Sequence, residues 1–271
     1  MMDILIMAAP LVLVTVGALV SEYAGRMALF LDGAINLGAF LCFLYTVQTG
    51  SVTVGCLLAL GSVTACILLC ARIVERTDAA PFIASLAVNL FCNALVSLLS
   101  SLTFGTRGVL TDSAFIFSVP QAQLWTTLGA YVAATLIVTL LFTTRSGLYL
   151  RITGTDSAVL ISRGIDASWN RTHAWCIAAA CGALAGSFLA IRLSSFVPNG
   201  AGGRGWIALA CVFLGKKRVL PVISAAILFC LIQYATYTLP IVQHIAPSLL
   251  IALPYVAILF LIAAAPDTSS S

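Results

Sequence analysis

The sequence predicts an all-α, polytopic membrane protein: one transmembrane domain over residues 1–271, with about eight to nine membrane-spanning segments and some broken helices. Two observations predict this class. Hydrophobic residues make up 61% of the chain and charged residues only 8%, with a mean hydropathy of +1.11. A soluble domain averages about 25% charged residues. The apolar residues also fall in long runs, and a bilayer core needs about 20 of them per helix.

The first two apolar runs, 4–20 and 29–47, are joined by a polar break, and the second run contains Asp32 and Asn36. An aspartate at the centre of a membrane helix costs about 2.5–3.5 kcal/mol on insertion scales. Irregular backbone at membrane depth is tolerated only where protein covers it. We therefore expect a broken or kinked element over residues 21–38 that packs inside the protein.

Six further runs have spanning length: Val52–Ala71, Pro81–Phe104, Trp125–Thr143, His173–Leu193, Leu220–Leu239 and Ala246–Ala265. Pro81 suits a first helical turn, and Asn89 and Asn93 lie four residues apart on one polar stripe. Trp206–Leu214 is too short for a full crossing. It predicts a half-helix, a re-entrant segment, or a span that extends backward through the glycines before it.

The stretches 17–38 and 182–215 are both interrupted by glycines and a charge, at roughly corresponding places in the two halves of the chain. Paired interruptions of this kind can mark a transport pathway; chance similarity of helices rich in Gly and Ala explains them at least as well. The GAGGRG sequence at 200–205 has no preceding strand, so we expect a tight turn or close helix packing rather than a phosphate site.

Residues 145–171 form the longest polar interval and hold four of the 13 Lys and Arg residues. We interpret this interval as a cytoplasmic loop with a short docking helix, which Thr155 or Asp156 caps and Gly164 ends. Such a short helix is marginal alone, so its apolar residues need cover. A groove on a partner protein and the lipid headgroup layer are both candidates.

The placement of positive charge predicts the orientation. The loops at 72–78, 145–171 and 216–218 carry two, four and three Lys or Arg residues, whereas those at 105–124 and 238–246 carry one and none. The positive-inside rule assigns the first group to the cytoplasm. Counting crossings then predicts an N-terminus outside and a cytoplasmic C-terminus.

The sequence lacks the motifs that are typical of several classes of protein. The chain has no GxxxxGK[ST] phosphate loop, and its two histidines lie at predicted membrane edges without a Cys or carboxylate cluster. We therefore expect no catalytic residue, no metal site and no cofactor. A net charge of +4 makes nucleic acid a poor partner. An ion-coupled secondary transporter of a small polar solute is the alternative, although Asp32 is the single deep carboxylate.

Three stretches carry a resemblance to a known family: APLVLVTVGALVSEYAGRMALFLDGAINLGAF at 9–40, GTDSAVLISRGID at 154–166 and GGRGWIALACVFLG at 202–215. The likeness continues through LLIALPYVAILF at 249–260. The chain resembles the permease subunits of bacterial ABC importers in the branched-chain amino acid, simple-sugar and nucleoside class. It is most similar to the shorter of the two permeases that pair in nucleoside- or riboflavin-type systems. The family pattern differs at Ala28 and Asp32, where Asn and Glu are usual.

The resemblance implies a transport subunit of the bacterial inner membrane rather than an enzyme. It implies four partners: a separate ATPase subunit, a second homologous permease, an extracytoplasmic substrate-binding protein and the lipid bilayer. The solute implied is nucleoside-like or a flavin such as riboflavin. The central stretch is similar to the family's coupling helix, which docks on the ATPase. The residues matched to it are Gly154, Asp156, Ala158, Val159, Leu160, Ile161, Arg163 and Gly164.

In the pathway itself, buried amides can bond the edge of a polar ring, and an aromatic side chain can stack on its face. The candidates are Asp32, Asn36, Asn89, Asn93, Gln233, Tyr234 and Trp206. For each polar residue the competing interpretation is a hydrogen bond that holds helices together in the membrane.

Overall fold

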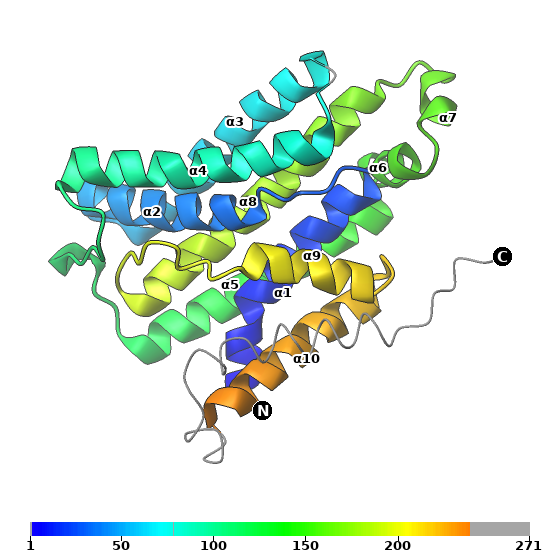
Figure 1. Cartoon of the computed structure of the whole chain (residues 1–271). Helices are drawn as coiled ribbons and strands as arrows, with labels where there is room; N and C mark the ends of the chain where they lie inside the picture. Colours follow the sequence, from blue (N-terminus) through cyan, green and yellow to red (C-terminus); the bar gives the residue numbers. More distant parts are fainter. Residues whose placement is uncertain (1, 78, 239–271) are drawn as a thin grey trace.

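The computed structural model describes residues 2–77 and 79–238, and this part of the chain is helical apart from its connections (Figure 1). The elements are α1 (Met2–Tyr23), α2 (Leu31–Thr49), α3 (Val52–Thr77), α4 (Pro81–Phe104), a 3-10 turn η1 (Ser113–Phe115), α5 (Val119–Thr143), α6 (Arg145–Thr155), α7 (Ser157–Ile161), α8 (Ala167–Leu193), α9 (Arg204–Leu214) and α10 (Val219–Thr238). The predicted all-α class is confirmed for these residues.

Six of the described helices, α1–α5 and α8, are long and apolar enough to cross a membrane. Helix α9 and residues 219–235 of α10 are shorter apolar segments, and the expected span Ala246–Ala265 lies outside the described residues. The predicted number of about eight to nine segments is therefore not established. The matched stretch at 249–260 and the C-terminus also lie outside the described residues.

The centre of the bundle is formed by α1, α2 and α8, which are mostly buried, whereas less than a third of the apolar stretch of α3, α4 and α5 is buried: 28%, 28% and 22%. Glycines let α2 and α8 approach closely. A Cβ added to Gly38 would lie 2.5 Å from the Cα of Ala183, and one on Gly186 would overlap the carbonyl oxygen of Ile35. Small residues at such crossings are the usual means of close helix packing in lipid.

The second helix starts deep inside the bundle. Phe30, just before α2, packs edge-to-face on Trp175 with ring centroids 5.2 Å apart, and a Cβ on Gly182 would touch Ala34. Because Gly182 lies midway along α8, α2 begins about halfway through the bundle. The break predicted for residues 21–38 is confirmed, and it covers the non-helical residues between α1 and α2.

The chain between α8 and the end of α9 crosses the bundle in two parts. Residues 194–203 return from the end of α8 without forming a helix, and α9 then continues for 11 residues. Of the three alternatives, a helix extended backward through the glycines is therefore wrong, and a short helix after them is present. Gly203 caps α9 in the left-handed conformation, with φ 77°, which a glycine adopts without strain.

Three positively charged loops meet at one end of the bundle. Arg26 pairs with Glu75 at 2.8 Å, Arg171 lies 4.0 Å from the same carboxylate, and Lys217 pairs with Glu22 at 2.8 Å. We call this the charged end. The loops at 72–78, 145–171 and 216–218 thus share one side of the bundle, as the predicted orientation requires.

The polar interval differs from its prediction in one respect. We expected a loop with one short helix, but residues 145–155 form α6 before that helix begins. The hydroxyl oxygen of Thr144 accepts a hydrogen bond from Gly147 N at 3.2 Å and caps the start of α6. Although the composition of α6 is polar, this cap and the contacts of α6 with α1, α5 and α8 stabilise it.

Candidate functional site

Three of the predicted pathway residues come together between α2 and α4, and we call Asn36, Asn89 and Asn93 the amide cluster. Asn36 Nδ2 donates to Asn93 Oδ1 at 2.8 Å, and Asn93 Nδ2 donates to the carbonyl oxygen of Asn89 at 3.1 Å. Asn89 Oδ1 accepts from Gly33 N at 2.6 Å. The cluster therefore joins the first turn of α2 to the middle of α4.

Asp32 joins a second pair of helices. Its Oδ1 accepts a hydrogen bond from Gly205 N at 3.3 Å, and a Cβ on Gly205 would lie 2.9 Å from the Cα of Asp32. The carboxylate lies in the first turn of α2 and also at the start of α9. Helix N-termini attract negative charge, so one aspartate stabilises two of them where they meet. Close packing at Gly205 confirms the interpretation of the glycine-rich stretch.

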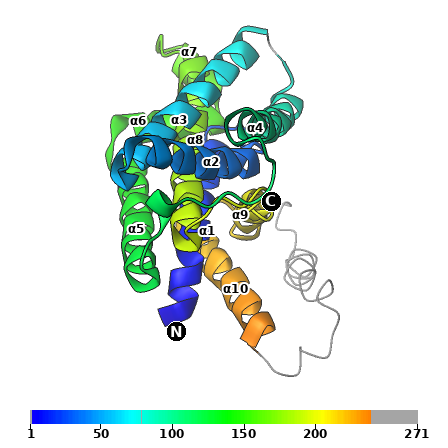
Figure 2. The same ribbon diagram turned by 90° about the vertical axis from the view of Figure 1, so that its left-hand side faces the viewer.

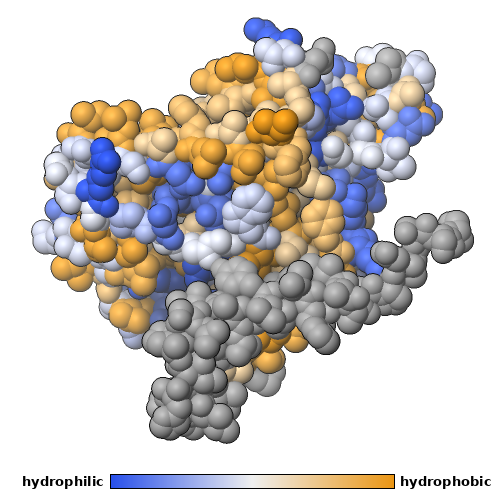
Figure 3. Space-filling view, in the orientation of Figure 1, coloured by the Kyte–Doolittle hydropathy of each residue, from blue (hydrophilic) through white to orange (hydrophobic). Residues whose placement is uncertain are grey.

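These contacts use much of the hydrogen-bonding capacity of the cluster within the protein. Asn36 and Asn89 are buried, and Asn36 Oδ1 is buried without a hydrogen-bond partner among the described residues. Asn93, Asp32 and Arg204 are partly exposed. Figure 3 shows hydrophilic surface over α2, between the apolar ridge of α4 and α9. Asn93 and Asp32 are therefore the residues with surface left for a solute, and their pathway role stays a prediction.

The other predicted pathway residues lie in two places. Trp206 follows Gly205, the residue whose N–H bonds Asp32, at the start of α9, and the Trp206 side chain is 43% exposed. Gln233 and Tyr234 lie on α10, which packs mainly against α1 and α9. Figures 1 and 2 both show α10 turning away from α2 and α4 toward its last residues. The structure therefore groups Trp206 with Asp32 and places Gln233 and Tyr234 apart from the amide cluster.

The short helix predicted in the polar interval is present as α7. Asp156 rather than Thr155 is its cap, because Asp156 Oδ1 accepts from Ala158 N at 2.9 Å. Gly164 has φ +74° and follows the turn in which Arg163 N donates to the carbonyl oxygen of Leu160 at 3.0 Å. Asp156 and Gly164 therefore bound the helix and its final turn, as the sequence predicts. Figure 1 shows α7 projecting from the bundle beside the first residues of α8.

One residue of α7 is not available to a partner. We expected the apolar residues of this helix to fill a groove in another protein, but Leu160 is only 1% exposed. Leu160 lies on the buried side of α7, and α7 packs against α6 and α8. Ala158 and Arg163 are exposed, and Val159 is 42% exposed. A partner that binds α7 would therefore meet these three residues, with Leu160 as the anchor beneath them.

Gly154 connects α7 to the membrane-spanning part of the protein. A Cβ on Gly154 would overlap the carbonyl oxygen of Tyr23 and lie 2.8 Å from Gly25 N. A polar pocket of about 310 Å³ lies beside this contact, lined in part by Arg26 and Arg171. The end of α6 thus rests directly on the connection between α1 and α2.

The sequence analysis did not single out Arg192, which fastens three helices at the end opposite the charged end. Its Nε and Nη2 donate to the hydroxyls of Thr126 and Thr127 at 2.8 and 2.9 Å, and its Nη1 donates to the carbonyl oxygen of Ile6 at 2.6 Å. A lone arginine inside an apolar run signals a bonded or functional residue. Arg192 is such an arginine, because it lies near the end of the apolar run 173–193.

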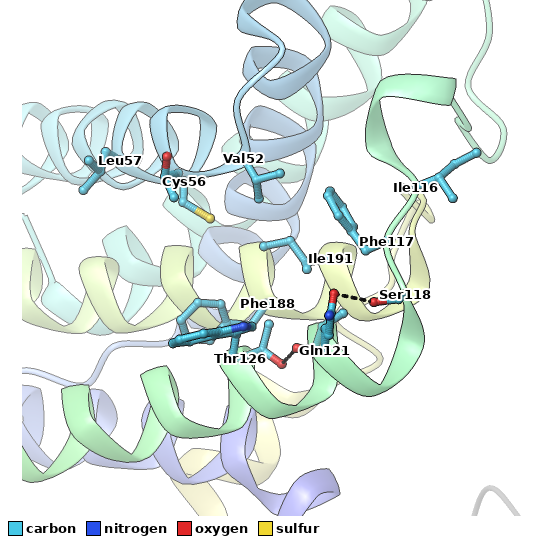
Figure 4. Close-up of a pocket in the computed structure, with 13 residues that line it drawn as sticks. Val52, Cys56, Leu57, Ile116, Phe117, Ser118, Gln121, Thr126, Phe188 and Ile191 are labelled. Carbon is cyan, nitrogen blue, oxygen red and sulfur yellow. Dashed lines mark hydrogen bonds between the residues drawn. The ribbon is translucent and has the colours of Figure 1, made fainter.

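A pocket of about 690 Å³ lies near Arg192, between α3, α5 and α8 (Figure 4). Some of its polar groups are bonded within the protein: Ser118 Oγ donates to Gln121 Oε1 at 2.7 Å, and Thr126 accepts from Arg192. Most of the lining is apolar, and Leu57 is 67% exposed. A mostly apolar lining of this kind does not favour a hydrophilic solute.

Comparison with known proteins agrees with this architecture. The family model for the branched-chain amino acid transport system permease component matches residues 1–263. The chain is 24% identical over 285 residues to the nucleoside ABC transporter permease protein NupC of Lactococcus lactis, covering 96% of this chain and 90% of that protein. It is 24% identical over 279 residues to the guanosine ABC transporter permease protein NupQ of Bacillus subtilis, covering 93% and 87%.

A solved structure shares the fold. PsaBC from Streptococcus pneumoniae in complex with Fab superposes with a TM-score of 0.52 at 14% identity, covering 97% of this chain and 91% of that chain. Together with the multi-pass bundle, the family match identifies a membrane transport subunit rather than an enzyme. The chain belongs to the permease components of branched-chain amino acid type ABC transport systems.

Proposed function

We propose that this chain forms, with a second homologous permease, the translocation pathway of an ABC importer in the bacterial inner membrane. The solute is nucleoside-like or a flavin, and a separate ATPase supplies the energy. An extracytoplasmic binding protein delivers the solute. The observation that carries the proposal is the contact between Gly154 and the α1–α2 connection, because it joins the end of α6, next to α7, to the end of α1 and the segment that leads into α2.

The coupling helix in this proposal is α7. The charged end of the bundle faces the cytoplasm, and the C-terminus is proposed to be cytoplasmic too. Val159, Ala158 and Arg163 are exposed for docking, and an apolar helix face with a cation at its end suits a groove with acidic edges. Arg151 is less suited than Arg163 to meet such an edge, because its guanidinium lies over the Phe142 ring, 4.7 Å from its centroid. ATP-driven closure of the ATPases would displace α7 and α6 as a rigid unit.

The solute proposal rests on the surface over α2. Asn93 and Asp32 have accessible polar atoms, and Trp206 beside them exposes an aromatic face. Amides and a carboxylate can bond the edge of a heterocycle, while an indole stacks on its face. The names of the relatives NupC and NupQ favour a nucleoside over riboflavin. An ion-coupled mechanism is not favoured, because Asp32 is already bonded to Gly205 N.

The decisive experiment reconstitutes the full chain with its ATPase, its partner permease and its binding protein in proteoliposomes. We expect uptake of labelled guanosine or riboflavin only with ATP and the binding protein present. Uptake by this chain alone, driven by an ion gradient without nucleotide, would contradict the proposal. Separate binding assays of both solutes on the isolated binding protein identify the solute independently of the coupling mechanism.

A further inference from the structure

Two adjoining pockets, one more polar and one apolar, lie along the bundle between α5, α6 and α8. The polar half has a volume of about 530 Å³ and the apolar half about 300 Å³, and both are lined by Ser146, Leu150 and Ile177. Because these three residues line both pockets, the two pockets adjoin, and we describe them together as one groove with two halves. It lies apart from the amide cluster and from α7.

The polar half holds a positive charge without a carboxylate partner. The Arg72 guanidinium at the end of α3 lies over the Trp169 ring, 3.8 Å from its centroid, and no ion pair among the described residues includes Arg72. His173 packs on the same indole, with ring centroids 4.5 Å apart. Asp166 also lines this half, but its Oδ1 is bonded to Ser168 N at 2.8 Å.

A buried amide adds a free donor to the same place. Asn170 lines the polar half and is 9% exposed, and its Nδ2 has no hydrogen-bond partner among the described residues. A buried donor left unbonded costs free energy of about 1–3 kcal/mol. A cation, a free donor and the Tyr149 side chain in one recess match the oxygens of an anionic group.

The apolar half lies deeper in the bundle, where a lipid chain would be. It is lined by Val20, Ile137, Leu140 and Leu141, and Leu140 is 47% exposed. Along α8 the polar half is lined by residues from Asp166 to His173 near the charged end, and the apolar half by Ile177, one turn further in. A molecule in the groove would therefore place its polar part at the charged end.

The groove also faces the side of the bundle that suits lipid. Figure 2 shows α5 and α6 on the side of the bundle away from α4 and α9, and the hydrophilic surface over α2 lies between those two helices in Figure 3. Outward residues of α5 are apolar: Leu136 is 56% exposed and Phe142 47%. Trp169 and Tyr149 beside the polar half are the residue types that concentrate at membrane interfaces.

We propose that this groove binds one anionic phospholipid of the leaflet at the charged end. The phosphate contacts Arg72 and the free donor of Asn170, and the first part of an acyl chain occupies the apolar half. Basic pockets between membrane helices on the cytoplasmic side are known to suit such headgroups. A lipid bound there would connect the end of α3 to α6 and α8, and so would hold the base of α7 in place.

The test is native mass spectrometry of the purified full chain with added phosphatidylglycerol or phosphatidylcholine. We expect preferential retention of phosphatidylglycerol, and Arg72→Gln should lower its retention about tenfold, the loss of one charged hydrogen bond of about 1.4 kcal/mol. Arg76→Gln is the matched control, because Arg76 is exposed on the same helix and does not line the groove. It should retain lipid like the wild type.

A second variant keeps the test independent of Arg72. Leu140→Trp fills the apolar half and should lower retention of both lipids, while its melting temperature reports that it is folded. Equal retention by Arg72→Gln and Arg76→Gln would overturn the proposal, as would equal retention of the two lipids by the wild type. Displacement of phosphatidylglycerol by millimolar inorganic phosphate would also overturn it, because it would show a site for free phosphate.

Discussion

Asn36 on α2 donates a hydrogen bond to Asn93 on α4 at 2.8 Å, and this bond links two helices at the depth where α2 begins. The two residues lie 57 positions apart in the sequence. Each is four residues from another polar group on its own helix, Asp32 and Asn89. The polar residues of α2 and α4 therefore face each other along about one helical turn each.

Removal of this bond should reveal a coupled pair. We expect Asn36→Ala and Asn93→Ala to destabilise the protein less than additively when combined, with a coupling free energy of about 0.5–1.5 kcal/mol. Asn36→Ala combined with Gln121→Ala, an exposed residue at the start of α5, should be additive. Free energies of unfolding of the four variants of each cycle, measured in one detergent, provide the comparison. Full additivity of the asparagine pair would contradict the bond.

Asp32 should stabilise the meeting of α2 and α9 through its charge. Asp32→Asn keeps an oxygen for Gly205 N but removes the charge, which is worth about 0.3–1 kcal/mol at a helix N-terminus. Asp32→Leu leaves that donor unbonded and should cost about 1–3 kcal/mol. Thermal unfolding measures both. Asp112→Asn, which caps only the turn η1, is the control. Normal stability of Asp32→Asn with lost solute uptake would instead assign the carboxylate to the solute.

The sequence predicts those features of the α2, α4 and α9 contacts that depend on residues near one another in the chain. The spacing of Asn89 and Asn93 predicts a shared helix face, and the polar break near Asp32 predicts an interrupted helix. The contact of Asp32 with Gly205 spans 173 positions. No local pattern specifies that partner, so the sequence predicts that Asp32 is buried in protein without showing where.

In the polar interval 145–171, the sequence predicts the boundaries of one helix correctly but misses another helix. Low hydropathy between Arg145 and Arg171 was interpreted as a loop, yet Thr144 caps α6 there. Asp156 and Gly164 are local signals and bound α7 as predicted. The burial of Leu160 follows from packing against α6 and α8, and a five-residue helix contains no periodicity that distinguishes its buried side.

Close packing of α2 on α8 should make Gly186 intolerant of a side chain. Gly186→Ala would place a methyl group against the carbonyl oxygen of Ile35, and such overpacking costs about 1–3 kcal/mol. Gly61→Ala on α3 meets nothing within 4 Å and should be neutral, or stabilising by about 0.5–1 kcal/mol through helix propensity. Melting temperatures of the two variants test the difference. A tolerated Gly186→Ala would argue against this helix crossing.

Arg192 should require the geometry of its guanidinium and not only its charge. Arg192→Lys retains a cation but cannot bond Thr126, Thr127 and Ile6 together, because an ammonium group lacks the planar fork. We expect a loss of about 1–3 kcal/mol in the free energy of unfolding. Arg107→Lys, exposed in the connection after α4, serves as the control. Equal stability of Arg192→Lys and the wild type would show that the three bonds contribute little.

The exposed and buried residues of α7 should respond differently to a charge. Val159→Asp changes a side chain that is 42% exposed, so the protein should fold normally. Stimulated ATP hydrolysis by the assembled transporter should fall at least tenfold, which corresponds to a loss of about 1.4 kcal/mol of docking free energy. Leu160→Asp puts a carboxylate at a position 1% exposed and should reduce the amount of folded protein. Val109→Asp, 59% exposed after α4, should affect neither property. Normal ATPase stimulation in folded Val159→Asp would contradict docking through α7, because Val159 is an apolar residue exposed on this helix.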